Sequence, residues 1–288
     1  MFRPFELIEP SSVAEAIGCL EAHPDDARIY AGGSELLLVM RLGLLHPRLL
    51  VNIKRIPGMD RLELQNGNLK IGPLVTHRTL EISPMIKEKF ALIAQMESKV
   101  ANVRVRNVGT LGGNLAFAEP HSDPATLFLI YEARVMVESS RGTKEVPLGK
   151  FFTAAYETVM QPTEILTGIQ VPALPAGMMG AYIRWGVLER PTLNVAVGVK
   201  KGQDGLLESA RIAIGSVGPI PMRMLELEDS LRGMDITAAC AQVANSGPLL
   251  RARLAPANDI HGSEEYKIYM TKTLLQRALR EASGEAVQ

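Results

Sequence analysis

Two glycine-rich segments, far apart in the chain, constrain its fold more than any other feature. The first is Ala31-Gly32-Gly33-Ser34-Glu35 and the second is Thr110-Leu111-Gly112-Gly113-Asn114. Each follows an apolar, strand-like run and sets two adjacent glycines beside a short polar side chain. Because glycine has no Cβ and reaches unusual backbone angles, successive amide groups can converge on an anion such as phosphate. The pair therefore predicts two loops that close on one diphosphate; the alternative is two ordinary tight turns.

Composition and charge argue against nucleic acid and membrane as partners of this chain. The 288 residues include 31 basic and 31 acidic side chains, and 47% are hydrophobic, which is typical of a globular protein. Balanced charge and 5% aromatic content argue against a nucleic-acid partner. No run approaches the roughly 18 apolar residues of a membrane span, and the N-terminus lacks the apolar segment of a signal peptide. We therefore expect a cytoplasmic protein with no membrane span.

Candidate metal ligands and catalytic groups are sparse. Cys19 and Cys240 are the only cysteines, whereas an iron–sulfur cluster normally needs about four thiolates. The five histidines are scattered without the spacing of a zinc site. No acid–base pair is evident either. The sequence therefore predicts no metal site and no catalytic residue on this chain.

Hydrophobic patterning divides the chain into three parts: residues 1–55, 56–175 and 176–288. The first part reads as a β-α-β unit with a helix from Val13 to His23. The second opens with a hairpin over 61–71 and includes a helix over 85–99. After a linker at 172–180, the third part has strands at 181–187, 194–200 and 209–215, followed by helices. We expect an α+β protein: two α/β subdomains and a C-terminal domain with a small antiparallel sheet and helices.

Residues around the second cluster indicate the kind of ligand. No Gly-Lys-Ser/Thr follows the glycines, which excludes a Walker A loop, and the spacing is not that of a Rossmann fingerprint. Asn114 donates and accepts hydrogen bonds, whereas an ionised Asp123 only accepts. A carboxylate repels phosphate but suits ribityl or ribose hydroxyls. Phosphate donors at 110–114 and an acceptor at Asp123 fit a dinucleotide or a flavin.

The run Arg-Asn-Val-Gly-Thr-Leu-Gly-Gly-Asn at 106–114, followed by Ser-Asp-Pro at 122–124, carries a family resemblance. It closely resembles the FAD-binding medium subunits of molybdenum hydroxylases, such as aerobic carbon monoxide dehydrogenase and bacterial xanthine dehydrogenases. The resemblance covers nearly the whole chain, including the first glycine cluster and the C-terminal Gly-Ser-Glu-Glu-Tyr-Lys at 262–267. It implies the PCMH-type FAD-binding fold, with FAD held non-covalently between the first two subdomains.

Carried over by residue, the resemblance implies two diphosphate loops and three further contacts. The first loop is Ile29, Tyr30, Ala31, Gly32, Gly33, Ser34, Glu35 and Leu36, and the second is Thr110, Leu111, Gly112, Gly113 and Asn114. Asp123 would hold a sugar-like hydroxyl of the flavin, and Val100 and Leu166 would make apolar contacts. Related enzymes often carry Lys or Arg near Arg184, but Ile183 competes for the matching position.

The resemblance also implies partners. A large subunit would hold the molybdenum cofactor, and a small subunit would hold two [2Fe-2S] clusters that pass electrons to FAD here and then to an acceptor. The complex would be a dimer of heterotrimers. Two alternatives stay open: a stand-alone FAD-dependent oxidoreductase of the same superfamily, and a nucleotide-binding assembly module without redox function.

Four polar residues near these motifs have more than one interpretation. Thr76 predicts the start of a short helix, with His77 as a surface or capping group or, alternatively, a cofactor contact. His121 lies within the flavin motif, where it either adjoins the flavin or has no role there. Arg104 and Arg106 alternate with two valines as in a half-exposed strand. They would face solvent or another subunit, or else neutralise phosphate.

Overall fold

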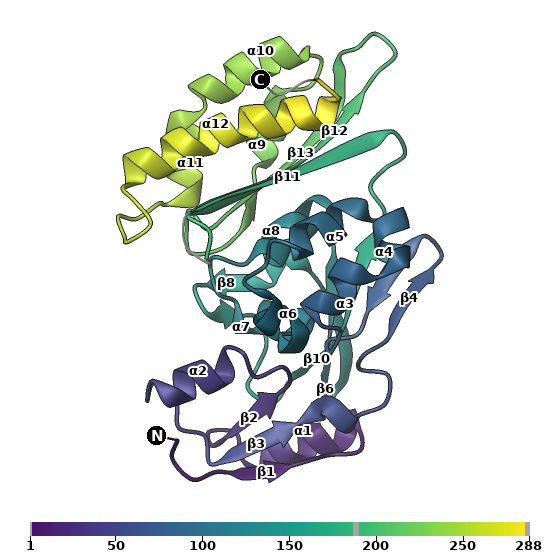
Figure 1. The fold of residues 1–288 in the computed structure, drawn as a ribbon, viewed down its shortest axis with the longest axis vertical. Coiled ribbons are helices and arrows are strands. Elements are labelled where there is room, and N and C mark those ends of the chain that lie inside the picture. Colours follow the sequence, from purple (N-terminus) through teal and green to yellow (C-terminus); the bar gives the residue numbers. More distant parts are fainter. Residues whose placement is uncertain (1, 187–189, 286–288) are drawn as a thin grey trace.

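The computed structural model of the protein describes residues 2–186 and 190–285. Three units follow one another along the long axis of the molecule, each built on its own main sheet (Figure 1). The N-terminal unit lies at one end, and the C-terminal helices lie at the other. The chain therefore has the expected mixture of helix and sheet, with an antiparallel sheet near its C-terminus.

The first unit is a parallel sheet with strand order β1-β3-β2. Its elements are β1 (Glu6–Ile8), α1 (Val13–Ala22), β2 (Ala27–Tyr30), α2 (Leu36–Arg41), β3 (Leu49–Asn52) and the 3-10 helix η1 (Ile53–Arg55). Helix α1 begins at Val13 because the Ser12 hydroxyl accepts a hydrogen bond from the amide of Glu15. The first glycine cluster lies between β2 and α2, as the pattern predicts.

The second unit is a five-stranded antiparallel sheet with strand order β4-β5-β10-β6-β7, accompanied by six helices. Its strands are β4 (Leu62–Gln65), β5 (Asn68–Ile71), β6 (Arg134–Ser139), β7 (Gly142–Pro147), β10 (Ile165–Pro172) and the separate pair β8 (Phe152–Ala154) and β9 (Glu157–Thr158). Its helices are α3 (His77–Ile82), α4 (Pro84–Lys89), α5 (Ala91–Glu97), α6 (Val103–Val108), α7 (Leu111–Phe117), α8 (Asp123–Ile130) and the 3-10 helix η2 (Leu148–Lys150).

Two secondary-structure predictions in this unit are wrong. The single helix expected over 85–99 is two helices, because the chain leaves the helical conformation at Phe90 (φ −137°). The strand expected at 103–106 is helix α6, which begins where the Asn102 side chain accepts hydrogen bonds from the amides of Arg104 and Val105. The second glycine cluster therefore follows a helix and not a strand. N-capping outweighed the two-residue alternation of valine and arginine.

In the third unit, α12 and α9 pack on an antiparallel sheet of order β11-β12-β13-β14, and α10 and α11 pack on α12. Its elements are β11 (Met178–Trp185), β12 (Leu193–Lys201), β13 (Leu207–Gly215), β14 (Met222–Arg223), α9 (Leu225–Ser230), α10 (Ile236–Asn245), α11 (Gly247–Leu254) and α12 (Glu264–Ser283). The sequence predicts three of these strands, and the short β14 is additional. Strand β11 begins inside the expected linker and ends at Trp185; Val187, the expected end, lies outside the described residues.

Helix α8 connects the second and third units. All eight of its residues are buried, which is the pattern of a helix covered on every side. It contacts α5 and α7 of its own unit, and β12 and β13 of the third. The largest hydrophobic cluster accordingly includes Tyr182, Ala196 and Ala213 from the C-terminal sheet. The second and third units thus share one continuous core.

In the part of the chain that the structure describes, no helix is both long and apolar enough to cross a membrane. The same residues contain no group of three or more His, Cys, Asp or Glu side chains placed to hold a metal ion.

A pair of glycine substitutions tests the shared core. A Cβ on Gly215 would lie 1.9 Å from Thr126 Oγ1 and 2.4 Å from Asn194 Oδ1, so we expect Gly215→Ala to cost about 1–3 kcal/mol. A Cβ on Gly18, in α1, meets nothing within 4 Å, and Gly18→Ala should stabilise by about 0.5–1 kcal/mol. Thermal midpoints measure both; equal midpoints for the two variants would contradict the packing.

Candidate functional site

The first glycine cluster contacts the segment just before the second. A Cβ on Gly32 would lie 2.1 Å from the carbonyl oxygen of Val108 and 3.1 Å from the Cα of Gly109. Gly33 has φ +79°, a conformation that side chains disfavour, and a Cβ there would collide with the Tyr30 ring. Both glycines are therefore needed for the loop to approach its neighbour, and the fold brings the two clusters together.

The first loop keeps several hydrogen-bond donors available. Within the described residues, the backbone amides of Gly32, Gly33, Ser34 and Glu35 donate to no protein group. The Ser34 hydroxyl oxygen is buried and also has no partner. Buried polar groups normally have partners, so an unpartnered hydroxyl beside four available amides marks a place for a ligand.

The second cluster does not present its amides as expected. The amide of Leu111 donates to the Val75 carbonyl (2.9 Å), and that of Gly112 donates to the Pro73 carbonyl (3.0 Å). The next two amides, of Gly113 and Asn114, donate to Thr110 Oγ1 (3.1 Å) and to the Thr110 carbonyl (2.9 Å). The prediction of free amides at 111–114 is therefore wrong, because two of them donate to the segment 73–75 and two donate to Thr110, the N-cap of α7.

The glycines of the second cluster have a packing role instead. A Cβ on Gly112 would lie 2.4 Å from the Pro73 side chain, and one on Gly113 would lie 2.9 Å from Thr110 Oγ1. Side chains remain available here. Asn114 Oδ1 accepts from the Ser122 hydroxyl (2.6 Å), while its Nδ2 contacts no group among the described residues.

Asp123, at the N-terminus of α8, lies in a buried polar cluster. Its Oδ1 accepts hydrogen bonds from Tyr182 Oη (2.5 Å) and Asn194 Nδ2 (3.3 Å), and Arg184 Nε lies 3.4 Å away. Asn194 Oδ1 in turn accepts from the Thr126 hydroxyl (2.7 Å). All these contacts use Oδ1, so within the described residues Oδ2 is left to accept from another group.

Burial controls the ionisation of this cluster. It raises the pKa of Asp123 from 3.8 to about 6, although the Tyr182 hydrogen bond and Arg184 act in the opposite direction. Burial, followed by the Asp123 charge, raises the pKa of Tyr182 well above its usual value. The phenol therefore stays protonated and keeps donating to the carboxylate at neutral pH.

The structure shows which of Ile183 and Arg184 lies on the side of β11 that faces Asp123. Neighbouring residues on a strand point to opposite faces, and on β11 Ile183 packs against the C-terminal hydrophobic cluster. Arg184 lies on the other face beside Asp123, with a side chain 16% exposed. Arg184 is thus the basic residue that faces the candidate site.

The remaining predicted residues surround the first loop or lie in the core. Ile29 and Tyr30 end β2, with Lys54 Nζ 4.0 Å above the Tyr30 ring, and Leu36 begins α2. Val100 and Leu166 are buried in the largest hydrophobic cluster. Leu111, of the second glycine loop, belongs to the same cluster, and its helix α7 packs against β10, which carries Leu166.

A chain of ionic contacts crosses from the first loop to the third unit. Arg190 pairs with Glu35 (3.2 Å) and with Glu119 (3.5 Å). Glu119 also contacts His121 Nδ1 (2.7 Å), and the His121 ring stacks on His261 at a centroid distance of 4.6 Å. His121 therefore lies in a contact between units.

One arginine and one histidine differ from their sequence interpretation. Thr76 caps α3 as predicted, but His77 is 3% exposed and its Nδ1 lies 2.8 Å from Glu97 Oε2. A surface role for His77 is therefore wrong. Arg106 binds Glu81 (2.8 Å) and the Val100 carbonyl (2.8 Å), so it is not a solvated side chain.

Sequence reasoning missed Glu97, Tyr182 and Asn194. They lie far along the chain from the residues that they contact, at separations of 20, 59 and 71 positions. Glutamate, tyrosine and asparagine are common residues, and none of these three is part of a recognisable motif. No local signal in a single sequence marks them.

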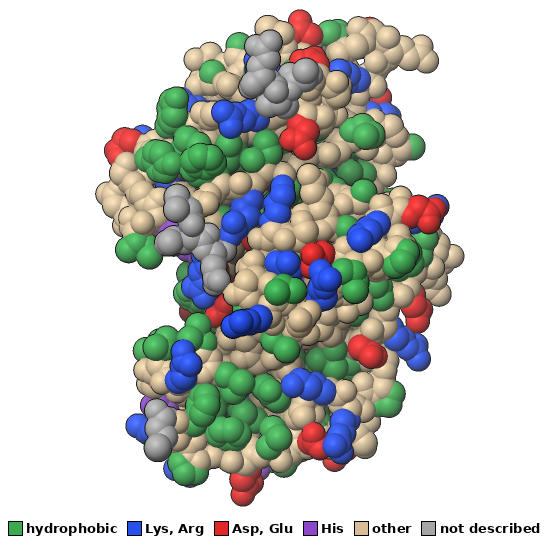
Figure 2. Space-filling view, in the orientation of Figure 1, with side chains coloured by type: hydrophobic (Ala, Val, Ile, Leu, Met, Phe, Trp, Pro, Cys, Tyr) green, Lys and Arg blue, Asp and Glu red, His purple; other side chains and the backbone are tan. Residues whose placement is uncertain are grey.

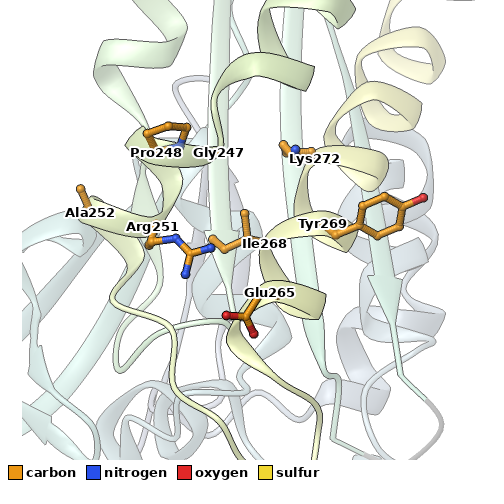
Figure 3. A pocket seen from close by; sticks show the side chains of 8 residues that line it. All are labelled: Gly247, Pro248, Arg251, Ala252, Glu265, Ile268, Tyr269 and Lys272. Carbon is orange, nitrogen blue, oxygen red and sulfur yellow. The ribbon is translucent and has the colours of Figure 1, made fainter.

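A groove of about 530 Å³ lies on the C-terminal unit, between α11 and α12 (Figure 3). Its walls include Pro248, Arg251, Ile268, Tyr269 and Lys272. These helices are at the far end of the molecule from the first glycine loop (Figure 1). The groove is therefore separate from the candidate site.

Two family models together match most of the chain. Residues 3–174 match the model of the FAD binding domain in molybdopterin dehydrogenase, and residues 189–282 match that of the CO dehydrogenase flavoprotein C-terminal domain. The chain is 31% identical to the carbon monoxide dehydrogenase medium chain of Hydrogenophaga pseudoflava over 96% of both chains. It is 32% identical to the nicotine 6-hydroxylase medium subunit of Paenarthrobacter nicotinovorans, again over 96% of both.

Solved structures agree with these matches. A chain of the Hydrogenophaga pseudoflava carbon monoxide dehydrogenase superposes with a TM-score of 0.93 at 30% identity, covering 100% of both chains. Quinoline 2-oxidoreductase from Pseudomonas putida 86 gives a TM-score of 0.90 at 28% identity, covering 99% of this chain and 98% of that one.

The pKa of Asp123 makes a pH-dependent prediction. The folded-state pKa of Asp123 is raised from 3.8 to about 6. Above about pH 6 the buried carboxylate is ionised and lowers the stability of the fold. This stability is regained as the pH falls from about 6 to 3.8, because the folded protein takes up the proton first. Asp123→Asn removes this dependence. Between about pH 4 and pH 7.5, the thermal midpoint of the wild type should fall by roughly 5–10 °C relative to the variant. A constant difference between the two midpoints would contradict the burial of an ionisable Asp123.

Proposed function

Because the chain belongs to the family of FAD-binding medium subunits of molybdenum-containing dehydrogenases, we propose that it binds FAD non-covalently as an electron-transfer subunit. It would take electrons from [2Fe-2S] clusters on a small partner subunit and deliver them to an external acceptor. When bound, FAD would supply the redox chemistry, because its flavin ring accepts electrons one at a time or in pairs. Substrate oxidation would occur at a molybdenum cofactor on a large partner subunit.

One observation above all carries the assignment of the cofactor to this chain. At the junction of the first loop with Val108–Gly109, the buried Ser34 hydroxyl and the four available amides of 32–35 offer donors without protein partners. A diphosphate accepts hydrogen bonds from such a set of donors, and the absence of a Cβ at Gly32 lets the backbone come close. The residues present therefore fit the FAD diphosphate.

Asp123 fits the sugar-like part of the flavin. Tyr182 and Asn194 hold Oδ1, and Arg184 supplies the nearby positive charge that favours an ionised carboxylate. Oδ2 is then an oriented acceptor for a hydroxyl. Asn114, bound to Ser122 next to Asp123, would offer its Nδ2 as a donor on the same side.

The two alternatives have less support. A stand-alone oxidoreductase needs a substrate pocket with its own catalytic side chains beside the flavin, whereas the groove of Figure 3 is on the outer helices of the C-terminal unit. A nucleotide-binding assembly module would use the donors at 32–35 as well, but the relatives that the chain matches are subunits of a dehydrogenase and of a hydroxylase. We therefore assign no catalytic residue to this chain.

Partner subunits are part of the same proposal. Figure 2 shows hydrophobic side chains gathered over the N-terminal unit. Leu38, Leu42 and Leu44, in or just after α2, are 37%, 62% and 74% exposed, and they follow the first glycine loop directly. Exposed apolar side chains beside a cofactor site suit a partner subunit that exchanges electrons there. The dimer of heterotrimers and the cytoplasmic location belong to this proposal as well.

Flavin release tests the proposal. Acid treatment of the purified chain should release FAD in equimolar amount, and Gly32→Ala should weaken FAD affinity at least tenfold, because its Cβ would displace the loop from Val108. Gly18→Ala, in a helix away from the site, is the matched control and should bind FAD like the wild type. A chain that holds no flavin and cannot be reconstituted with FAD would reject the proposal.

Co-expression tests the partners. The chain should co-purify with a large molybdenum subunit and a small iron–sulfur subunit, and sedimentation should measure the mass of the assembly. Turnover of substrate by the chain alone would instead favour the stand-alone oxidoreductase.

A further inference from the structure

His77 lies where the two glycine clusters meet. Its backbone amide donates to the Gly109 carbonyl (3.1 Å). A Cβ built on Gly109 would be 3.2 Å from His77 Cδ2 and equally 3.2 Å from Ser34 Oγ. The imidazole edge that carries Cδ2 and Nε2 therefore borders the same small space as the unpartnered Ser34 hydroxyl.

The opposite edge of the ring is held by a buried carboxylate. His77 Nδ1 lies 2.8 Å from Glu97 Oε2, and the side chains of the two residues are 4% and 0% exposed. A fixed partner on one nitrogen orients the ring and leaves the other nitrogen to a different group. Among the described residues, no group forms a hydrogen bond or ion pair with His77 Nε2.

We propose that His77 binds the diphosphate of FAD through Nε2, with Glu97 as the residue that orients it. This inference rests on the proposed function and adds a binding residue outside the two glycine loops. With Nδ1–H donated to Glu97, Nε2 accepts in the neutral ring and donates in the protonated ring. A phosphate oxygen only accepts, so it selects the protonated ring and a charge-assisted hydrogen bond.

The surroundings favour an anion over a neutral hydroxyl. The donors at this junction are the amides of 32–35 and the Ser34 hydroxyl, and the one carboxylate of the first loop, Glu35, is paired with Arg190. The acceptor for hydroxyls, Asp123, is hydrogen-bonded to Tyr182 and Asn194, although the Glu97 charge also acts on it and raises its pKa. A protonated His77 between Glu97 and a phosphate would have an opposite charge on each side.

Two substitutions separate the two ring nitrogens. In His77→Asn the amide nitrogen takes about the place of Nδ1, so the Glu97 contact is kept and the Nε2 donor is lost. In His77→Gln the amide nitrogen takes about the place of Nε2, so the donor is kept. The matched control is His46→Asn, at an exposed position outside the site.

Equilibrium titration of the full-length, deflavinated chain with FAD and with ADP measures the effect. We expect His77→Asn to raise the dissociation constants of both ligands about 10- to 100-fold, as for loss of one charge-assisted hydrogen bond. His77→Gln should recover at least part of this loss, and His46→Asn should match the wild type. The thermal midpoints of the ligand-free variants report any change in folding separately.

Each other outcome has a defined meaning. If the wild type binds FAD and His77→Asn binds it equally well, this inference is wrong and the proposed function stands. If affinity falls for FAD but not for ADP, the contact is not with the diphosphate, and the inference is again wrong. A wild type that binds no flavin rejects both proposals. Should His77→Asn fail to fold, a crystal structure of the wild type with FAD decides: His77 Nε2 must lie within about 3.2 Å of a phosphate oxygen.

Discussion

Asp123 begins a helix that is buried on every side between the second and third units, and this placement determines which groups surround its carboxylate. Its carboxylate is held by Tyr182 and Asn194, two side chains of the C-terminal sheet. The acceptor proposed for the flavin thus belongs to the second unit, while the groups that orient it belong to the third. The proposed site therefore includes groups of the third unit as well as of the first two.

The burial of this carboxylate has a cost, and the structure offsets it with hydrogen bonds. Desolvation raises the pKa of Asp123 to about 6, and without Tyr182, Asn194 and Arg184 it would rise further. A carboxylate with three contacts on one oxygen cannot turn freely, so its second oxygen has a defined direction. Preorganisation of this kind lowers the entropy that a cofactor must lose on binding.

The two glycine clusters have different roles, although their sequences look alike. Gly32 and Gly33 let a loop with available amides lie against Val108 and Gly109. Gly112, by contrast, lets α7 pack closely on Pro73, and the amides of 111–114 donate to the segment 73–75 and to Thr110. The first loop therefore offers backbone donors to a ligand, whereas the second cluster offers only side chains. His77, between them, would add a charged donor.

Local signals in the sequence were enough to predict most strands, the α+β class, the position of the first loop between strand and helix, and the family. These features depend on hydrophobic periodicity, on caps such as Ser12 and on a contiguous motif at 106–114, all of which act within a few residues. The same reasoning failed at 103–106, where one capping asparagine outweighed an alternating pattern.

Only the tertiary structure decided which groups face the site. The pairing of His77 with Glu97, of Asp123 with Tyr182 and Asn194, and of Glu35 with Arg190 joins residues 20 to 155 positions apart. Such contacts arise when separate elements pack, and nothing in the local sequence encodes the partner. The amides of the second cluster likewise look available in the sequence, and it is the formation of α7 against Pro73 that engages them.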